Sequence, residues 1–150
     1  MPRADLVEAS RLISASAAEI FELLAHPAQH ALIDGSGTVK GVQERTPLRL
    51  SAGARFGMQM QWGRRYKILN EVVEFEEGRR IAWRHFGGHV WRYILEPVGE
   101  RSTQVTEQFD PAGAKSPLLL RLIRAGQRNR ASIEETLSRI ERWARDTQPR

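Results

Sequence analysis

The sequence predicts an α+β fold, in which a curved antiparallel sheet of six to seven strands wraps around one long C-terminal helix. Three observations support this prediction. An amphipathic stretch spans residues 116–145, a run of short segments separated by tight turns fills residues 38–109, and a capped helix begins near residue 17. Because the strands follow one another and the helices stand apart from them, the helices are expected on one side of the sheet.

The stretch 116–145 has the residue pattern of a long helix. Apolar residues recur at spacings of three and four, which places them on one side. They are Leu119, Leu122, Ile123, Gly126, Ile133, Leu137, Ile140 and Ala144. Pro117 suits the first turn, where its missing N–H needs no partner. A helix of this length is about 40 Å long, so it can span a small domain from end to end.

The other elements are expected in order along the chain. Ser16 and Glu19 form the capping box of the first helix, and Pro27 ends it. A Gly/Ser hinge at 34–37 precedes the run of strands, and a linker at 110–115 follows it. Strands are predicted at 6–13, 38–44, 54–62, 66–76, 80–85, 89–97 and 103–109, and short helices at 17–25 and 28–32.

The composition limits the classes of function. With 41% hydrophobic and 27% charged residues, the 150 residues are expected to form one globular domain, with a core over about 6–145. The absence of cysteine excludes disulfides and thiolate chemistry. The net charge of +5 comes with no nucleic-acid-binding motif, so no nucleic-acid partner is expected. No apolar run reaches the roughly 20 residues of a membrane span, and a cytoplasmic protein is predicted.

The hairpin at Gly87 and Gly88 can be aligned in two registers. A two-residue loop pairs Trp83 with Arg92 and mixes aromatic and charged side chains on both faces. A three-residue loop over 86–88 separates the faces and is preferred, because cross-strand aromatic pairs stabilise a sheet. This register pairs His85 with His89, Trp83 with Trp91, and Ile81 with Tyr93. It predicts an inner wall rich in tryptophan, tyrosine and histidine.

The neighbouring strand at 66–76 does not identify its inner face clearly, since both faces are partly apolar. Val73 and Phe75 continue beside the aromatic wall, which would turn Glu71 inward near His85. A β-bulge would reverse part of this alternation. Both orientations of Glu71 remain open at this point.

Short segments throughout the chain match a known family. They are ISASAAEIF at 13–21, HP at 26–27, DGSG at 34–37, VVEF at 72–75, RIAW at 80–83 and YILEP at 93–97. Together with the layout, they resemble the START/SRPBCC superfamily, and more narrowly its polyketide cyclase/dehydrase-like branch, over nearly the whole chain. The resemblance implies a helix-grip fold with a cavity between sheet and helix. It also implies binding of lipids, sterols, hormones, flavonoids or polyketides, with cyclisation, dehydration or hydrolysis in a minority of members.

The best polar cluster predicted from the sequence contains His85 and His89, joined by Glu71 and Tyr93. His85, Tyr93 and Glu71 are the candidate catalytic residues, because an acid–base pair acting on an enolisable carbonyl is what an aromatase/cyclase needs. Histidine and glutamate also suit zinc, but no third ligand has convincing spacing and no metal is expected. A polar lining that orients a ligand, or histidines exposed at the hairpin, is the alternative.

A cavity under the helix would be lined by rings, thioethers and a few polar groups. The candidate ligand-binding residues are Met58, Met60, Trp62, Trp83, His85, Trp91, Tyr93, Glu107, Ile123, Gly126 and Arg130. Core packing is the other explanation for the aromatic members. Arg130 is predicted to pair with Glu107, to bind a ligand carboxylate, or to extend to the rim. His26 and His30 are expected at the surface, because Pro27 interrupts the helix that would align them.

Three functions remain open. The first is binding of a hydrophobic small molecule, lipid-like, aromatic or polyketide-like, by a monomer or homodimer without a cofactor. The second is a polyketide aromatase/cyclase or dehydratase, which would require His85 and Tyr93 to face one open cavity. The third is a ligand-free interaction module, which would have its interior filled by Trp83 and Trp91.

Overall fold

The computed structural model describes residues 6–35, 39–42, 46–85, 88–113 and 125–147. Residues 116–124 of the predicted long helix, with the candidate Ile123, lie outside these ranges. Within the described ranges, no helix combines the length and the apolar character that a bilayer crossing requires.

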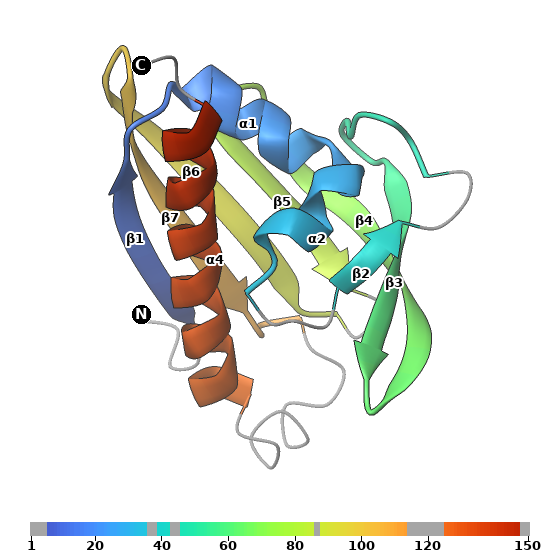
Figure 1. Cartoon of the computed structure of the whole chain (residues 1–150). Coiled ribbons are helices and arrows are strands. Elements are labelled where there is room, and N and C mark those ends of the chain that lie inside the picture. Colours follow the sequence, from blue (N-terminus) through green and yellow to red (C-terminus); the bar gives the residue numbers. More distant parts are fainter. Residues whose placement is uncertain (1–5, 36–38, 43–45, 86–87, 114–124, 148–150) are drawn as a thin grey trace.

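Seven antiparallel strands form one sheet in the order β1-β7-β6-β5-β4-β3-β2. The strands are β1 (Val7–Ile13), β2 (Val39–Val42), β3 (Arg55–Trp62), β4 (Arg64–Glu76), β5 (Arg80–His85), β6 (Val90–Gly99) and β7 (Ser102–Asp110). The described helices are α1 (Ala17–Ala25), the 3-10 turn η1 (Pro27–Gln29), α2 (His30–Ile33) and α4 (Ala125–Thr147). The helices lie on one face of the sheet, which curls around α4 (Figure 1). The predicted α+β class and helix-grip arrangement are confirmed.

The two longer helices form where the sequence pattern places them. The N–H of Glu19 donates to the Ser16 hydroxyl at 3.1 Å, and the N–H of Ser16 donates to the Glu19 carboxylate at 3.2 Å, so the predicted capping box starts α1. In α4 the apolar stripe is fully buried against the sheet. Its described side chains, Ile133, Leu137, Ile140 and Ala144, are all 0% exposed. Burial of this stripe contributes most of the stability of α4.

Burial along the inner face of the sheet decreases from one end to the other. Ile81, Leu95 and Val105 are fully buried where β5, β6 and β7 meet at one end. At the opposite end of β5 and β6, four aromatic side chains of the inner face remain half-buried. They are Trp83, His85, His89 and Trp91. Among the described residues, the inner face is therefore fully packed at one end and partly accessible at the other.

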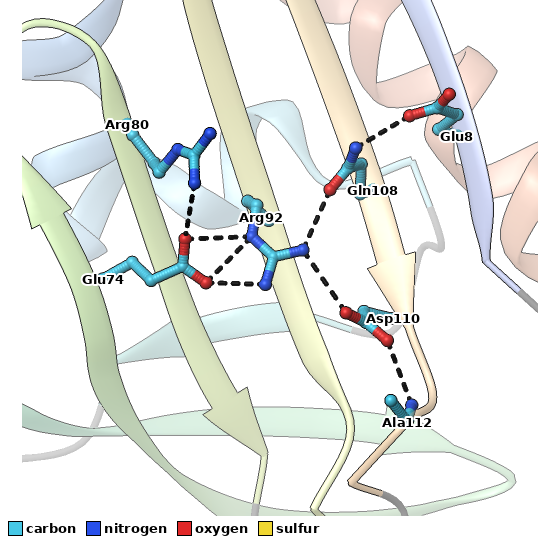
Figure 2. A network of polar contacts seen from close by, with 7 residues as sticks. All are labelled: Glu8, Glu74, Arg80, Arg92, Gln108, Asp110 and Ala112. Atoms are coloured by element: carbon cyan, nitrogen blue, oxygen red, sulfur yellow. Dashed lines mark hydrogen bonds and ion pairs between the residues drawn. The ribbon is translucent and has the colours of Figure 1, made fainter. Parts of the chain in front are cut away.

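The outer face of the sheet carries a polar row across five strands. Glu74, Ala82, Arg92, Gln108 and Glu8 are direct neighbours on β4, β5, β6, β7 and β1. Arg92 donates to Glu74 at 2.6 Å and to Gln108 at 2.9 Å, and Gln108 donates to Glu8 at 2.7 Å (Figure 2). Because Ala82 is short, the guanidinium of Arg92 reaches a carboxylate two strands away. These side-chain hydrogen bonds connect β4 to β1 across the sheet without involving the helices.

Candidate functional site

The hairpin between β5 and β6 has the predicted three-residue register. Trp83 pairs with Trp91, and the N–H of His85 donates to the carbonyl of His89 at 2.9 Å. The two imidazole rings stack with their centres 4.5 Å apart. The predicted inner wall of aromatic residues is therefore present.

In the adjacent strand β4, Glu71 does not face inward as one of its two predicted orientations required. A bulge at Val73 shifts the pairing of β4 with β5 and reverses the alternation of side chains between its two halves. Asn70 is the neighbour of His85 and is 3% exposed, whereas Glu71 is exposed. The inward orientation of Glu71 is wrong, and the buried polar group next to His85 is the amide of Asn70.

His30 was expected at the surface, and the structure shows that this expectation is wrong. Pro27 begins the 3-10 turn η1, and His30 then begins α2 with its side chain 7% exposed. Its Nε2 donates to the carbonyl of Leu24 at 2.8 Å, and its ring stacks on Trp83 with centres 4.9 Å apart. Burial lowers the pKa of His30, although the hydrogen bond to Leu24 and the charge of Asp34 oppose this effect. His30 is therefore a neutral member of the inner wall.

Trp83 lies at the centre of a set of rings. Its ring contacts Phe56 of β3 edge-to-face at 5.6 Å and Tyr93 of β6 at 5.6 Å, in addition to His30 of α2. Phe109 of β7 extends the set, 5.1 Å from His89 and 5.1 Å from Trp91. Rings from five elements thus gather at the inner face of the sheet.

Tyr93 and Glu107 form the polar pair of this surface. They are direct neighbours on β6 and β7, 6% and 2% exposed, and the Tyr93 hydroxyl donates a hydrogen bond to the Glu107 carboxyl group. The other oxygen, Oε1 of Glu107, has no hydrogen-bond partner in the described part of the chain. Burial raises the pKa of Glu107 well above its ordinary value, and the nearby charge of Asp34 raises it further. Glu107 therefore favours the protonated form.

The remaining candidates divide between the interior and the surface. Met58 is 3% exposed and Met60 packs against the core. Arg130 is exposed, so of its three predicted environments the solvent-facing one is found. It lies at the flank of the buried stripe, three residues before Ile133, where its long side chain reaches water. Trp62 at the end of β3 and Gly126 at the start of α4 have a described backbone only, so their contacts lie outside the description.

The stacked histidines predict a pH-dependent stability. Burial lowers the pKa of His85 and of His89 from 6.5 to about 4, and the charge of His89 contributes to the shift at His85. Between these two values the unfolded chain binds more protons than the folded chain. The free energy of unfolding is therefore expected to fall as the pH is lowered from 6.5 to 4. Thermal unfolding in a pH series measures this fall.

The double variant His85→Gln/His89→Gln should show a weaker pH dependence across this window than the unmodified protein. His26→Gln is the matched control, because it removes a partly exposed histidine near α1 whose Nδ1 contacts the Glu22 carbonyl. Equal pH dependence in the double variant and the control would contradict the assignment.

Within the described residues, no group of three or more His, Cys, Asp or Glu side chains is arranged to hold a metal ion.

The sheet, the helices on one face and the inner wall of rings define a protein of the helix-grip class. Known structures share this architecture. A START superfamily protein from Mycobacterium smegmatis aligns with a TM-score of 0.73 at 15% identity, over 95% of this chain and 99% of that one. The Polyketide_cyc-like protein Cgl2372 from Corynebacterium glutamicum aligns with a TM-score of 0.59 at 18% identity, over 93% and 91%. At such identities the likeness shows the fold alone.

Sequence comparison adds the family. The model of the family described as polyketide cyclase/dehydrase and lipid transport matches residues 5–144, and the chain belongs to this family. The predicted polyketide cyclase-like branch is thereby confirmed. An uncharacterized protein of Mycobacterium tuberculosis, Rv0088, is 36% identical over 133 residues, which are 85% of this chain and 59% of that protein. The chain therefore spans about three fifths of the length of the curated relatives it matches.

Proposed function

We propose that the protein binds a hydrophobic small molecule, lipid-like, aromatic or polyketide-like, between the inner face of the sheet and α4. The observation that carries this proposal is the uneven burial of the inner face. Trp83 and Trp91 remain half-buried although they face the helices, whereas Leu95 and Val105 at the other end are fully packed. Accessible rings with a few placed polar groups are typical of a ligand site.

Two further findings support this function over a ligand-free interaction module. The polar groups at the inner wall, Asn70 and the Tyr93–Glu107 pair, are few and lie among rings, as expected for groups that orient an apolar ligand. The description of the family includes lipid transport, which is a ligand-binding function. An interior filled by Trp83 and Trp91 would have left these rings fully buried.

A neutral apolar fluorophore, N-phenyl-1-naphthylamine, tests the proposal. We expect saturable binding with an increase in fluorescence. Trp83→Ala should weaken the affinity about tenfold or more, since a large ring surface is lost from the site. Leu69→Ala is the matched control, because Leu69 is an exposed apolar residue on the outer face of β4. Thermal unfolding establishes that both variants are folded at the temperature of the titration.

Equal affinities of the Trp83→Ala and Leu69→Ala variants would place the fluorophore on the surface and contradict the proposed site. Absence of saturable binding to the unmodified protein would contradict the function itself. Native mass spectrometry of the purified protein adds an independent measurement, in which a retained small molecule is the expected result.

One observation favours a second candidate, a cyclase or dehydratase. The buried Tyr93–Glu107 pair holds a carboxylic acid that favours its protonated form, which suits a general acid acting on an enolisable carbonyl. Glu71 is exposed and is therefore not a catalytic residue in this candidate function. The buried Glu107 takes its place as the acidic residue. Exchange of the α-hydrogens of a 1,3-diketone in D2O, with and without the protein, tests this candidate.

A further inference from the structure

The inner wall contains an acidic group whose hydrogen-bonding capacity is not filled. Glu107 is 2% exposed, and Tyr93 occupies one of its oxygens while Oε1 has no partner in the described residues. A buried polar atom left without a hydrogen bond costs about 1–3 kcal/mol. A ligand group that forms a hydrogen bond with Oε1 would remove this cost, as an acceptor for the protonated acid or as a donor to the carboxylate.

A second carboxylate acts on the same place. Asp34 follows α2 and accepts a hydrogen bond from the N–H of Val39 at 3.1 Å. Its charge is close enough to raise the pKa of both Glu107 and Tyr93. Among the residues whose side chains the structure describes, no lysine or arginine is buried, and Arg130, for which pairing with Glu107 was one of three predicted environments, is exposed. The described part of the interior therefore holds these two acidic groups and no buried lysine or arginine.

The rings around Glu107 suit a cation as well. Tyr93 is its direct neighbour on the sheet, and the ring of Trp83 lies 5.6 Å from that of Tyr93. The face of an aromatic ring attracts a cation within about 6 Å, and tryptophan does so most strongly. Trp83 is half-buried, so part of its ring is accessible. A positively charged group near Glu107 would gain from both the carboxylate and the rings.

We propose that the ligand is an organic amine, whose ammonium group donates to Oε1 of Glu107 and whose apolar body lies against Trp83. This inference rests on the proposed binding of a small molecule between sheet and α4. Glu107 releases its proton to solvent when the ammonium binds, so the pair formed is a carboxylate and an ammonium. By the same reasoning, a ligand that carries a carboxylate is disfavoured, because it approaches two acidic groups, and no lysine or arginine among the described side chains is buried beside them.

Three probes with one ring system and different head groups test this inference. They are 2-naphthylmethylamine, 2-naphthylmethanol and 2-naphthoate, and each is measured by displacement of N-phenyl-1-naphthylamine at pH 7.5. We expect the amine to bind at least about tenfold more tightly than the alcohol, as a charge-assisted hydrogen bond permits, and the carboxylate to bind most weakly. Non-specific association with a protein of net charge +5 would give the opposite order.

Glu107→Gln should reduce the amine-to-alcohol ratio to about threefold or less, because the amide keeps an acceptor for Tyr93 but carries no charge. Glu96→Gln is the matched control on the exposed part of β6 and should leave the ratio unchanged. The ratio in the unmodified protein tests the inference even if Glu107→Gln fails to fold. If the alcohol or the carboxylate binds as tightly as the amine, the inference of an amine ligand is wrong, but binding of a small molecule at the proposed site is still supported. If neither the fluorophore nor any probe binds, the proposed function fails as well.

Discussion

Gly35→Ala is expected to lower the free energy of unfolding by about 3 kcal/mol, a large value for the addition of one methyl group. A Cβ at Gly35 would lie 2.3 Å from the carbonyl oxygen of Ser132 and 2.5 Å from the backbone nitrogen of Thr136. Both atoms belong to the backbone of α4, which cannot shift locally as a side chain can. The N–H of Gly35 also donates to the Thr136 hydroxyl at 2.8 Å, so the loop after α2 is fixed directly on α4.

Urea unfolding of the unmodified protein and of Gly35→Ala measures this difference in the free energy of unfolding. Gly41→Ala provides the control, since a Cβ at Gly41 would have Gln59 Oε1 as its nearest neighbour at 3.8 Å, an ordinary contact. It should change the stability by about 0.5 kcal/mol or less. If the two variants unfold at the same urea concentration, the close approach of the loop to α4 is not a determinant of stability.

Arg92→Met should lower the free energy of unfolding by about 3 kcal/mol, because it removes the central residue of the polar row on the outer face (Figure 2). Arg92 forms ion pairs with Glu74 at 2.6 Å and with Asp110 at 3.4 Å, and the Asp110 side chain is only 4% exposed. Removal of the guanidinium leaves the charge of Asp110 buried without its arginine, which is more costly than the loss of an exposed pair. Chemical unfolding at moderate ionic strength measures the effect.

Arg80→Met is the matched control for the polar row. Arg80 contacts the same carboxylate of Glu74 at 3.2 Å, but its side chain is 44% exposed. An exposed ion pair contributes about 0–1 kcal/mol and is screened by salt. Similar losses in Arg92→Met and Arg80→Met would show that burial of the row does not determine its contribution.

The features that were predicted correctly depend on local signals or on face separation. The capping box of α1 lies within four residues, from Ser16 to Glu19, and requires nothing from the rest of the chain. The register of the β5–β6 hairpin follows from the difference between an aromatic face and a charged face, which a slip by one residue would mix. Trp83 and Trp91 are therefore sufficient to predict the inner wall from the sequence.

The features that were missed depend on backbone irregularities. The bulge at Val73 changes which side chains of β4 face inward, and both faces of that strand are partly apolar, so the sequence does not reveal it. Pro27 was expected to leave both His26 and His30 at the surface. It begins a 3-10 turn that leads directly into α2, and the side chain of His30 then points inward. One available signal was the spacing of three between His30 and Ile33, which are both buried.

The acidic pair was only partly predictable. Glu107 was predicted as a ligand-binding residue, and Arg130 was one of the partners considered for it. The helical spacing places Arg130 only at the flank of the stripe, and a long side chain at a flank is free to extend into water. That Tyr93 is the partner of Glu107 follows from the pairing of β6 with β7, which becomes visible once both registers are known.

The unfilled oxygen of Glu107 has a practical consequence for identifying the natural ligand. A fold in which that oxygen has no hydrogen bond is less stable than one in which it has, so a compound that forms a hydrogen bond with this oxygen should raise the melting temperature by more than its apolar contacts alone would. Parallel melting curves of the unmodified protein and Glu107→Gln across a compound library would then separate molecules that reach this oxygen from those that only enter among the rings. Such a screen needs no assumption about a reaction.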